Sequence, residues 1–215
     1  MKNLREQTDA KIAAGRKGNP DFMKGVDEII EKAKAFKEGE NALKVGQKAP
    51  SFALPNPEGK LLSLDTLLEK GSIVITFYRG DWCPYCNLQL RALQARLPEI
   101  EALGATLVAI SPQVPDGSLT ESEINKMDFI VLSDQDAKVA TQFGVAWKTP
   151  EFLVEHMRVD RDLNLEEINN GNGTILPIPA TFILGQDGLV KWNYVNIDYR
   201  TRSEPEEIIE VLKNL

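Results

Sequence analysis

The apolar residues of this chain fall into short uninterrupted runs and longer spaced runs. The short runs are rich in β-branched and aromatic residues, which is typical of strands buried on both faces of a sheet. They predict strands at Ser72–Tyr78, Ala105–Ile110, Phe129–Leu132, Ala180–Leu184 and Leu189–Val195. A helical pattern separates the first two, so we expect them to lie parallel in a right-handed βαβ unit. The last two flank a Gly-containing turn and are expected to pair antiparallel.

Residues 1–42 show a charged helical pattern and are expected to form an N-terminal helical extension of a main domain, residues 43–215. A weak amphipathic helix over Leu4–Ala14 is followed by a break at Gly15–Asn19, and Pro20 suits the start of a second helix. The second helix carries one apolar stripe, made of Phe22, Met23, Val26, Ile29, Ile30, Ala33 and Phe36. A stripe of this width has to be buried, against the main domain or against a second copy in a homodimer.

Turn and cap signals predict three further elements. A segment marked by Pro and Gly predicts a hairpin of Phe52–Leu54 with Leu61–Leu64. Capping-box patterns predict a helix over Thr120–Met127 and a last helix capped by Ser203 with Glu206.

The remaining helical segments are less regular. Pro98 interrupts a helical pattern, so residues 99–103 are expected to form a second short helix or a kinked continuation. Ser133 or Asp134 is expected to cap a helix over Ala137–Phe143. Residues 147–174 have the character of an insertion that forms a wall or lid of the active site, with helices at Glu151–Arg158 and Leu163–Asn169.

The composition limits the class of protein. With 215 residues, of which 42% are hydrophobic, the chain can build one substantial core and an appendage. Its net charge of −7 disfavours nucleic acid and anionic membranes as partners. No apolar run approaches the ~20 residues that a membrane-spanning helix needs, and the first residues lack the apolar stretch of a secretory signal. We therefore expect a cytoplasmic protein.

The chain has two cysteines, Cys83 and Cys86, which lie where the Ser72–Tyr78 strand gives way to a helix. Pro84 suits the first helical position, where its missing N–H costs nothing. A helix N-terminus offers unpaired N–H groups and the positive end of the helix dipole, which lower cysteine pKa values from about 8.5 to about 3.5–7.5. The spacing also brings both sulfurs to one side of the helix, so a small disulfide ring can close. The pattern predicts a redox-active dithiol.

Two other roles are open to these cysteines. A zinc site needs about four ligands, and besides the cysteines the chain offers only His156 and carboxylates, so we expect no metal. Free cysteines also pack like small apolar side chains, but the proline between them and Trp82 before them favour the redox role. His156 is too isolated in the sequence to be assigned as a catalytic base.

The five-residue segment Trp-Cys-Pro-Tyr-Cys at 82–86 resembles the active-site loop of the thioredoxin superfamily, and Cys-Pro-Tyr-Cys is similar to the glutaredoxin form. Upstream, Val45–Pro55, Gly59 and Leu62–Leu64 resemble the first segment of peroxiredoxins of the alkyl hydroperoxide reductase/thiol-specific antioxidant family. The resemblance runs from about Val45 to the C-terminus. It implies a thioredoxin-like α/β fold with a mixed central sheet and helices on both faces.

The resemblance also implies a thiol-dependent peroxidase. Cys86 matches the family's attacking cysteine, which a peroxide oxidises to a sulfenic acid. Cys83 resolves it to a disulfide, and a thioredoxin- or glutathione-type donor reduces that disulfide, with no cofactor. In the alternative role, a thiol-disulfide oxidoreductase, Cys83 attacks a substrate disulfide and Cys86 resolves the mixed disulfide. A non-enzymatic interaction domain of thioredoxin fold is the third alternative.

Four neighbours complete the expected site. Trp82 and Tyr85 are expected to cover the disulfide and shape the substrate surface. Pro179 matches a proline that is cis and lies against the cysteines in thioredoxin-like proteins, so the Ile178–Pro179 bond is expected to be cis. Arg79 holds a thiolate or a peroxide oxygen, or else it is a solvated charge on a loop.

The chain departs from the peroxiredoxin pattern at three positions. Arg79 replaces a proline, Cys83 replaces a threonine, and Pro179 stands where an arginine normally activates the peroxide. Loss of one preorganised donor lowers a rate by about 10²–10³. Peroxide reduction is therefore expected to be slow unless Arg79 compensates.

Overall fold

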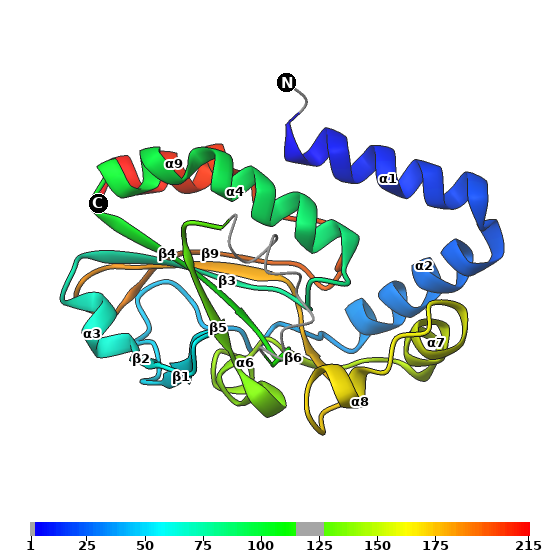
Figure 1. Cartoon of the computed structure of the whole chain (residues 1–215). Coiled ribbons are helices and arrows are strands. Elements are labelled where there is room, and N and C mark those ends of the chain that lie inside the picture. Colours follow the sequence, from blue (N-terminus) through cyan, green and yellow to red (C-terminus); the bar gives the residue numbers. More distant parts are fainter. Residues whose placement is uncertain (1–2, 115–126) are drawn as a thin grey trace.

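A five-stranded mixed sheet lies at the centre of the molecule (Figure 1). The computed structural model describes residues 3–114 and 127–215. In the order β5-β4-β3-β8-β9, the sheet consists of β5 (Ile130–Ser133), β4 (Ala105–Ser111), β3 (Ser72–Phe77), β8 (Ala180–Leu184) and β9 (Val190–Val195). The pairs β3/β4 and β4/β5 are parallel, whereas β3/β8 and β8/β9 are antiparallel. The predicted strands and their directions are confirmed.

Helices cover both faces of this sheet, which confirms the expected layers (Figure 1). On one face lie α4 (Pro84–Ala102), α9 (Pro205–Lys213) and, next to α4, α1 (Leu4–Gly18). On the other face lie α2 (Pro20–Ala35), α3 (Leu64–Leu68) and α6 (Lys138–Gln142). Because side chains alternate along a strand, Val74 packs on the α4 side, while Ile73 and Ile75 pack on the α2 side.

Shorter elements complete the described fold. The predicted hairpin is confirmed as β1 (Ala53–Pro55) paired antiparallel with β2 (Leu61–Ser63). A second antiparallel pair, β6 (Ala146–Lys148) with β7 (Ile175–Pro177), closes the base of the predicted insertion. Between them lie α7 (Glu151–Glu155), a π-helix (His156–Asp160) and α8 (Leu165–Ile168), which confirms the two helical segments predicted there. A short 3-10 turn, Gln135–Ala137, precedes α6.

The apolar stripe of the N-terminal helices packs against the main domain. Val26, Ile30 and Ala33 are buried and belong to the same core cluster as the sheet residues Ile73 and Ile75. This outcome favours the intramolecular alternative for the stripe. Phe36 is 79% exposed, so its inclusion in the stripe is wrong, because α2 has already ended at Ala35.

Two other local predictions differ from the structure. The first helix continues to Gly18, so the break is confined to Asn19, whose side chain caps α2. The last helix is capped by Glu204 with Glu207, because the buried Ser203 hydroxyl instead donates to Thr181. The helix expected from Thr120 falls on residues 115–126, outside the described part of the chain. Pro98 lies within α4, which confirms the continuous alternative.

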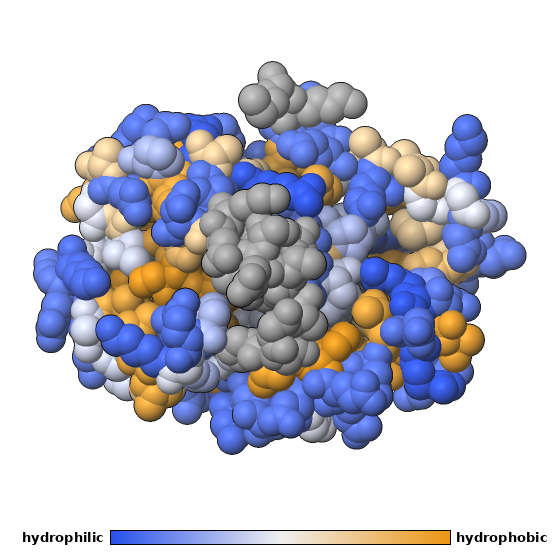
Figure 2. All heavy atoms as spheres, viewed as in Figure 1, coloured by the Kyte–Doolittle hydropathy of each residue, from blue (hydrophilic) through white to orange (hydrophobic). Residues whose placement is uncertain are grey.

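The surface seen from the same side is mostly polar, and its apolar atoms are spread over several places, on the left, along the lower edge and on the right near α7 (Figure 2). Phe152 of α7 and Val159 of the π-helix are both exposed. Among the described residues, no helix is long and apolar enough to cross a membrane.

Candidate active site

The candidate site lies where β3 runs into α4. The Tyr78 N–H donates to a carbonyl of β4 (2.9 Å), which keeps the chain in the sheet up to the loop. Cys83 is the N-cap residue of α4 and Pro84 its first residue, as predicted. Gly80 has a φ of +144°, and a Cβ there would lie 2.2 Å from Trp82 Nε1. Glycine therefore allows the indole to fold back over the loop.

Both cysteines are free thiols and almost completely buried, with 1% of Cys83 and 0% of Cys86 exposed. Hydrogen bonds on two sides hold the loop before them. The Asn87 side chain donates to the Asp81 carbonyl (2.6 Å), and the Asp81 N–H donates to the side chain of Gln113 (3.0 Å). The dithiol thus sits in a buried setting next to a hydrogen-bonded loop.

Arg202, which the sequence analysis missed, is the charged group closest to the sulfurs. Its Nη2 lies 3.0 Å from Cys86 Sγ and 4.0 Å from Cys83 Sγ. Its Nη1 donates to the backbone carbonyls of Tyr199 and Thr201. Arg202 is 5% exposed, so this guanidinium and the dithiol share one buried environment.

The two sulfurs share one negative charge. Burial opposes ionisation, yet the Cys86 thiol and the charges of Arg202 and Arg79 lower the pKa of Cys83 to about 5. Burial and the charge on Cys83 raise the pKa of Cys86 well above its ordinary value. At neutral pH the pair therefore holds one proton and one negative charge, in direct contact with a guanidinium.

Arg79 is buried rather than solvated, with 3% of the residue exposed. Its guanidinium carbon lies 5.2 Å from the ring centre of Trp82 and 4.4 Å from that of Tyr199. Its Nε and Nη2 have no hydrogen-bond acceptor among the described residues. The positive charge of Arg79 is held by aromatic faces and helps to lower the pKa of Cys83.

The aromatic residues of the loop are partly buried around the dithiol. Tyr85 meets Tyr199 edge to face, with ring centres 6.3 Å apart. Arg161, which follows the π-helix of the insertion, donates to the Trp82 carbonyl (3.0 Å). The insertion therefore reaches the active-site loop, in line with the wall or lid expected of residues 147–174.

The expectation of a cis peptide bond at Pro179 is wrong. None of the described residues has a cis peptide bond, so Ile178–Pro179 is trans. Only Ile178 and Pro179 lie between β7 and β8, and the Ile178 N–H donates to the Val145 carbonyl (2.7 Å), so pairing on both sides holds this bond in the trans form. Pro179 is buried and directly precedes Ala180, which pairs with Phe77 at the end of β3.

His156 lies in the π-helix and has partners of its own. Its ring stacks on Phe22 with centres 3.8 Å apart, and its Nδ1 lies 2.6 Å from an Asp160 oxygen. Among the described residues, no group of three or more histidine, cysteine or carboxylate side chains is arranged to hold a metal ion.

The sequence contains no local signal for the position of Arg202. Arg202 lies 116 residues after Cys86, in an irregular segment between β9 and α9. A buried thiolate next to a cation suits nucleophilic attack, and a second sulfur beside it suits disulfide formation. Proteins of similar sequence point to the same chemistry.

The sequence pattern of the AhpC/TSA family matches residues 45–193. A putative peroxiredoxin bcp of Haemophilus influenzae is 33% identical over 138 residues, which cover 64% of this chain and 86% of that protein. Peroxiredoxin Bcp of Escherichia coli K12 is 32% identical over 113 residues, covering 53% of this chain and 71% of that protein.

Solved peroxiredoxins have the same fold at lower identity. Peroxidoxin BcpB of Mycobacterium tuberculosis has 22% identity and a TM-score of 0.61, covering 80% of this chain and 98% of that chain. Peroxiredoxin 6 of Arenicola marina has 19% identity and a TM-score of 0.62, covering 80% and 73% of the two chains. These likenesses confirm the thioredoxin-like fold. The matched pattern and the relatives together show that the chain is a peroxiredoxin-like member of the AhpC/TSA family.

Proposed function

We propose that this protein is a thiol-dependent peroxidase in which Cys86 attacks the peroxide and Cys83 resolves the product. Hydrogen peroxide and organic hydroperoxides are the expected substrates. The observation that carries the assignment of Cys86 is the 3.0 Å contact between its sulfur and Arg202 Nη2. A guanidinium at that distance stabilises the thiolate and the negative charge that develops on the departing oxygen.

The reaction uses the single proton of the dithiol. When that proton resides on Cys83, the Cys86 thiolate attacks one peroxide oxygen and the O–O bond breaks. Cys86 becomes a sulfenic acid, and the departing alkoxide or hydroxide takes the proton from Cys83. The Cys83 thiolate then attacks the Cys86 sulfur, a disulfide forms and hydroxide leaves.

Arg202 supplies the cation that the family pattern has, and this chain lacks, at position 179. We assign Arg79 a supporting electrostatic role, because it lies between the rings of Trp82 and Tyr199 and lowers the pKa of Cys83. The arginine of the family pattern is absent at that position, and Arg202 compensates for it in this proposal. A different segment brings an equivalent charge to the sulfur.

The disulfide has to be reduced for a second turnover. We propose a thioredoxin- or glutathione-type thiol in the cytoplasm as the electron donor, acting by thiol-disulfide exchange. Because both sulfurs are buried, the donor thiol can reach them only if the loop bearing Trp82 and Tyr85 moves.

The test is stopped-flow oxidation of the fully reduced protein by one equivalent of hydrogen peroxide, followed by tryptophan fluorescence. We expect fast oxidation in the wild type and in Cys83→Ser, where it stops at a sulfenic acid on Cys86. In Cys86→Ser the fast phase should vanish. Oxidation no faster than that of a free thiol, or a fast phase that persists in Cys86→Ser, would contradict the proposal.

Thiol-disulfide exchange is the second candidate, and the low pKa of Cys83 favours it. In this role Cys83 attacks a protein disulfide and Cys86 resolves the product. A Cys86→Ser variant would then accumulate a mixed disulfide at Cys83, detectable by mass spectrometry. A wild type that reacts rapidly with protein disulfides and slowly with peroxide would place this function first.

A further inference from the structure

The segment that carries Arg202 has no regular secondary structure. We call residues 198–204 the arginine loop; they connect β9 to α9. The loop lies outside residues 45–193, the part that matches the family pattern. The position of the guanidinium against Cys86 therefore depends on what holds this loop.

Part of the support comes from the main domain itself. Arg200 binds both carboxylate oxygens of Asp198, at 2.8 and 2.9 Å. The Ser203 hydroxyl donates to Thr181 Oγ1 of β8 (3.0 Å). The Thr201 N–H donates to the Asp198 carbonyl (2.9 Å). These contacts fold the loop on itself and tie its end to the sheet.

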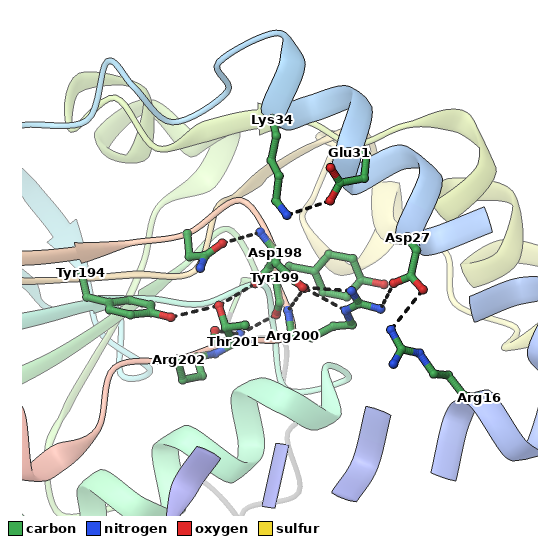
Figure 3. A network of polar contacts seen from close by, with 11 residues as sticks. Arg16, Asp27, Glu31, Lys34, Tyr194, Asp198, Tyr199, Arg200, Thr201 and Arg202 are labelled. Atoms are coloured by element: carbon green, nitrogen blue, oxygen red, sulfur yellow. Dashed lines mark hydrogen bonds and ion pairs between the residues drawn. The ribbon is translucent and has the colours of Figure 1, made fainter. Parts of the chain in front are cut away.

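A second support comes from the N-terminal helices (Figure 3). In that view Asp27 of α2 lies between Arg200 and Arg16 of α1. One oxygen of Asp27 is 2.7 Å from Arg200 Nη1, and the other is 3.2 Å from Arg16 Nη2. Burial acts against the charge, yet Arg200 and Arg16 lower the pKa of Asp27, so the carboxylate stays ionised at neutral pH.

The start of α1 makes a third contact, at the far end of the loop. The Glu204 carboxylate accepts hydrogen bonds from the backbone N–H groups of Leu4 (3.1 Å) and Arg5 (2.6 Å). These N–H groups belong to the first turn of a helix, where the positive end of its dipole favours a carboxylate. Glu204 also caps α9, so one side chain joins the two helices.

The two N-terminal contacts flank Arg202 on both sides, at Arg200 and at Glu204. The Arg200 side chain is 6% exposed, while that of Asp27 is 40% exposed. A buried guanidinium with two carboxylate partners has little freedom to turn away. The backbone between the two contacts, and the arginine it carries, is thereby held in place.

We propose that α1 and α2, through Asp27 and through the N–H groups that bind Glu204, are positioning elements that hold Arg202 against Cys86. Asp27 acts through Arg200 and the loop and does not touch the sulfurs. The proposal rests on the proposed function only where peroxide is the readout, because the pKa of the Cys83 thiol, which the charge of Arg202 lowers, reports the position of the same guanidinium without peroxide.

The first experiment substitutes Asp27→Asn in the full chain. The pKa of the Cys83 thiol, which the charge of Arg202 lowers, is measured in the reduced protein from the pH dependence of iodoacetamide alkylation. We expect a higher thiol pKa, with about three- to tenfold slower alkylation below the wild-type pKa, as the loss of one ion pair implies. Glu204→Gln should act in the same direction from the other contact.

The matched control is Glu31→Gln on the same helix, where Glu31 pairs with Lys34 (2.8 Å). This change removes an ion pair of α2 that does not include the arginine loop and should leave the thiol pKa as it is. A purely structural role of Asp27 predicts a lower melting temperature with an unchanged thiol pKa, and that result would overturn the proposal.

A double substitution tests the route. If Asp27 acts through Arg202, then adding Asp27→Asn to Arg202→Ala should shift the thiol pKa no further. If Asp27→Asn shifts the thiol pKa by the same amount in the wild type and in Arg202→Ala, the proposal is overturned. If the wild type proves slow with peroxide but the pKa results hold, the proposed function fails and the positioning role stands.

Discussion

At the scale of single residues, the candidate site consists of two sulfurs and two guanidiniums. Cys83 and Cys86 share one proton, and Arg202 is within 4.0 Å of both sulfurs. Arg79 adds a second buried positive charge, held by the rings of Trp82 and Tyr199. With the pair fully buried, the balance between these charges decides which sulfur is the thiolate.

Arg202→Ala should slow oxidation by hydrogen peroxide at neutral pH by about 10²–10³, because a preorganised charge next to the reacting sulfur is lost. Arg202→Lys should recover part of the rate, since it keeps the charge but loses the fork of donors. Stopped-flow fluorescence measures both. A rate for Arg202→Ala within twofold of the wild type would remove Arg202 from the mechanism.

The pH dependence of thiol reactivity follows from the shared proton. Alkylation of the reduced wild type should rise through an inflection near the pKa of about 5 and stay level above it, because the thiolate is the reactive form. In Cys83→Ser the pKa of Cys86 should fall from its raised position, because the neighbouring negative charge is gone. An inflection for Cys86 that stays at alkaline pH would show that Arg202 does not hold its thiolate.

Short-range caps decide how individual elements begin. Asp134 follows β5, is buried, and accepts hydrogen bonds from the backbone N–H groups of Val139 (2.9 Å) and Ala140 (2.8 Å). Ser133 instead donates to the Gln113 carbonyl (2.7 Å). The residue directly before α6 is Ala137, so neither predicted candidate is its N-cap residue, but the Asp134 carboxylate binds two N–H groups of the first turn of this helix.

Asp134→Ala should lower the free energy of unfolding by about 1–3 kcal/mol, because two buried N–H groups lose their acceptor. Denaturation with urea, monitored by circular dichroism, measures the change. Ser133→Ala serves as the neighbouring control, with a smaller expected loss. Equal losses for the two variants would argue against a role of Asp134 at the start of this helix.

The N-terminal helices and the sheet share one core at the scale of the whole molecule. Ile30 of α2 is 1% exposed and belongs to the cluster that contains Phe143 and Phe182. α1 lies beside α4, and the contacts of Glu204 and Asp27 join the helices to the arginine loop.

Ile30→Ala should cost about 2–5 kcal/mol of unfolding free energy, as expected for a large-to-small change in a packed core. We expect the wild type and the variant each to unfold in one transition, seen alike by tryptophan fluorescence and circular dichroism. Phe36→Ala, an exposed position just after the same helix, is the control and should have little effect. Two separate transitions would indicate that the extension folds as an independent unit.

Much of the molecule could be predicted from local sequence patterns. The five central strands, the hairpin, a helical segment from Glu151 and the dithiol at the strand-to-helix junction were all predicted from residues near one another in the chain. Strand propensity, helix periodicity and the role of Pro84 are local effects, so the sequence alone determined them. The match of residues 45–193 to the family's sequence pattern likewise depends on the sequence alone.

Only the tertiary structure decided what surrounds the sulfurs. Arg202 reaches Cys86 across 116 residues, and Asp27 reaches Arg200 from the other end of the chain. The burial of Arg79 and the trans bond at Pro179 likewise depend on how distant segments pack. Such contacts leave no periodic signal, because an irregular loop is held by its partners rather than by its own propensity. The sequence by itself therefore determined the fold and the place of the two cysteines, and the packing of remote segments decided which charges lie beside them.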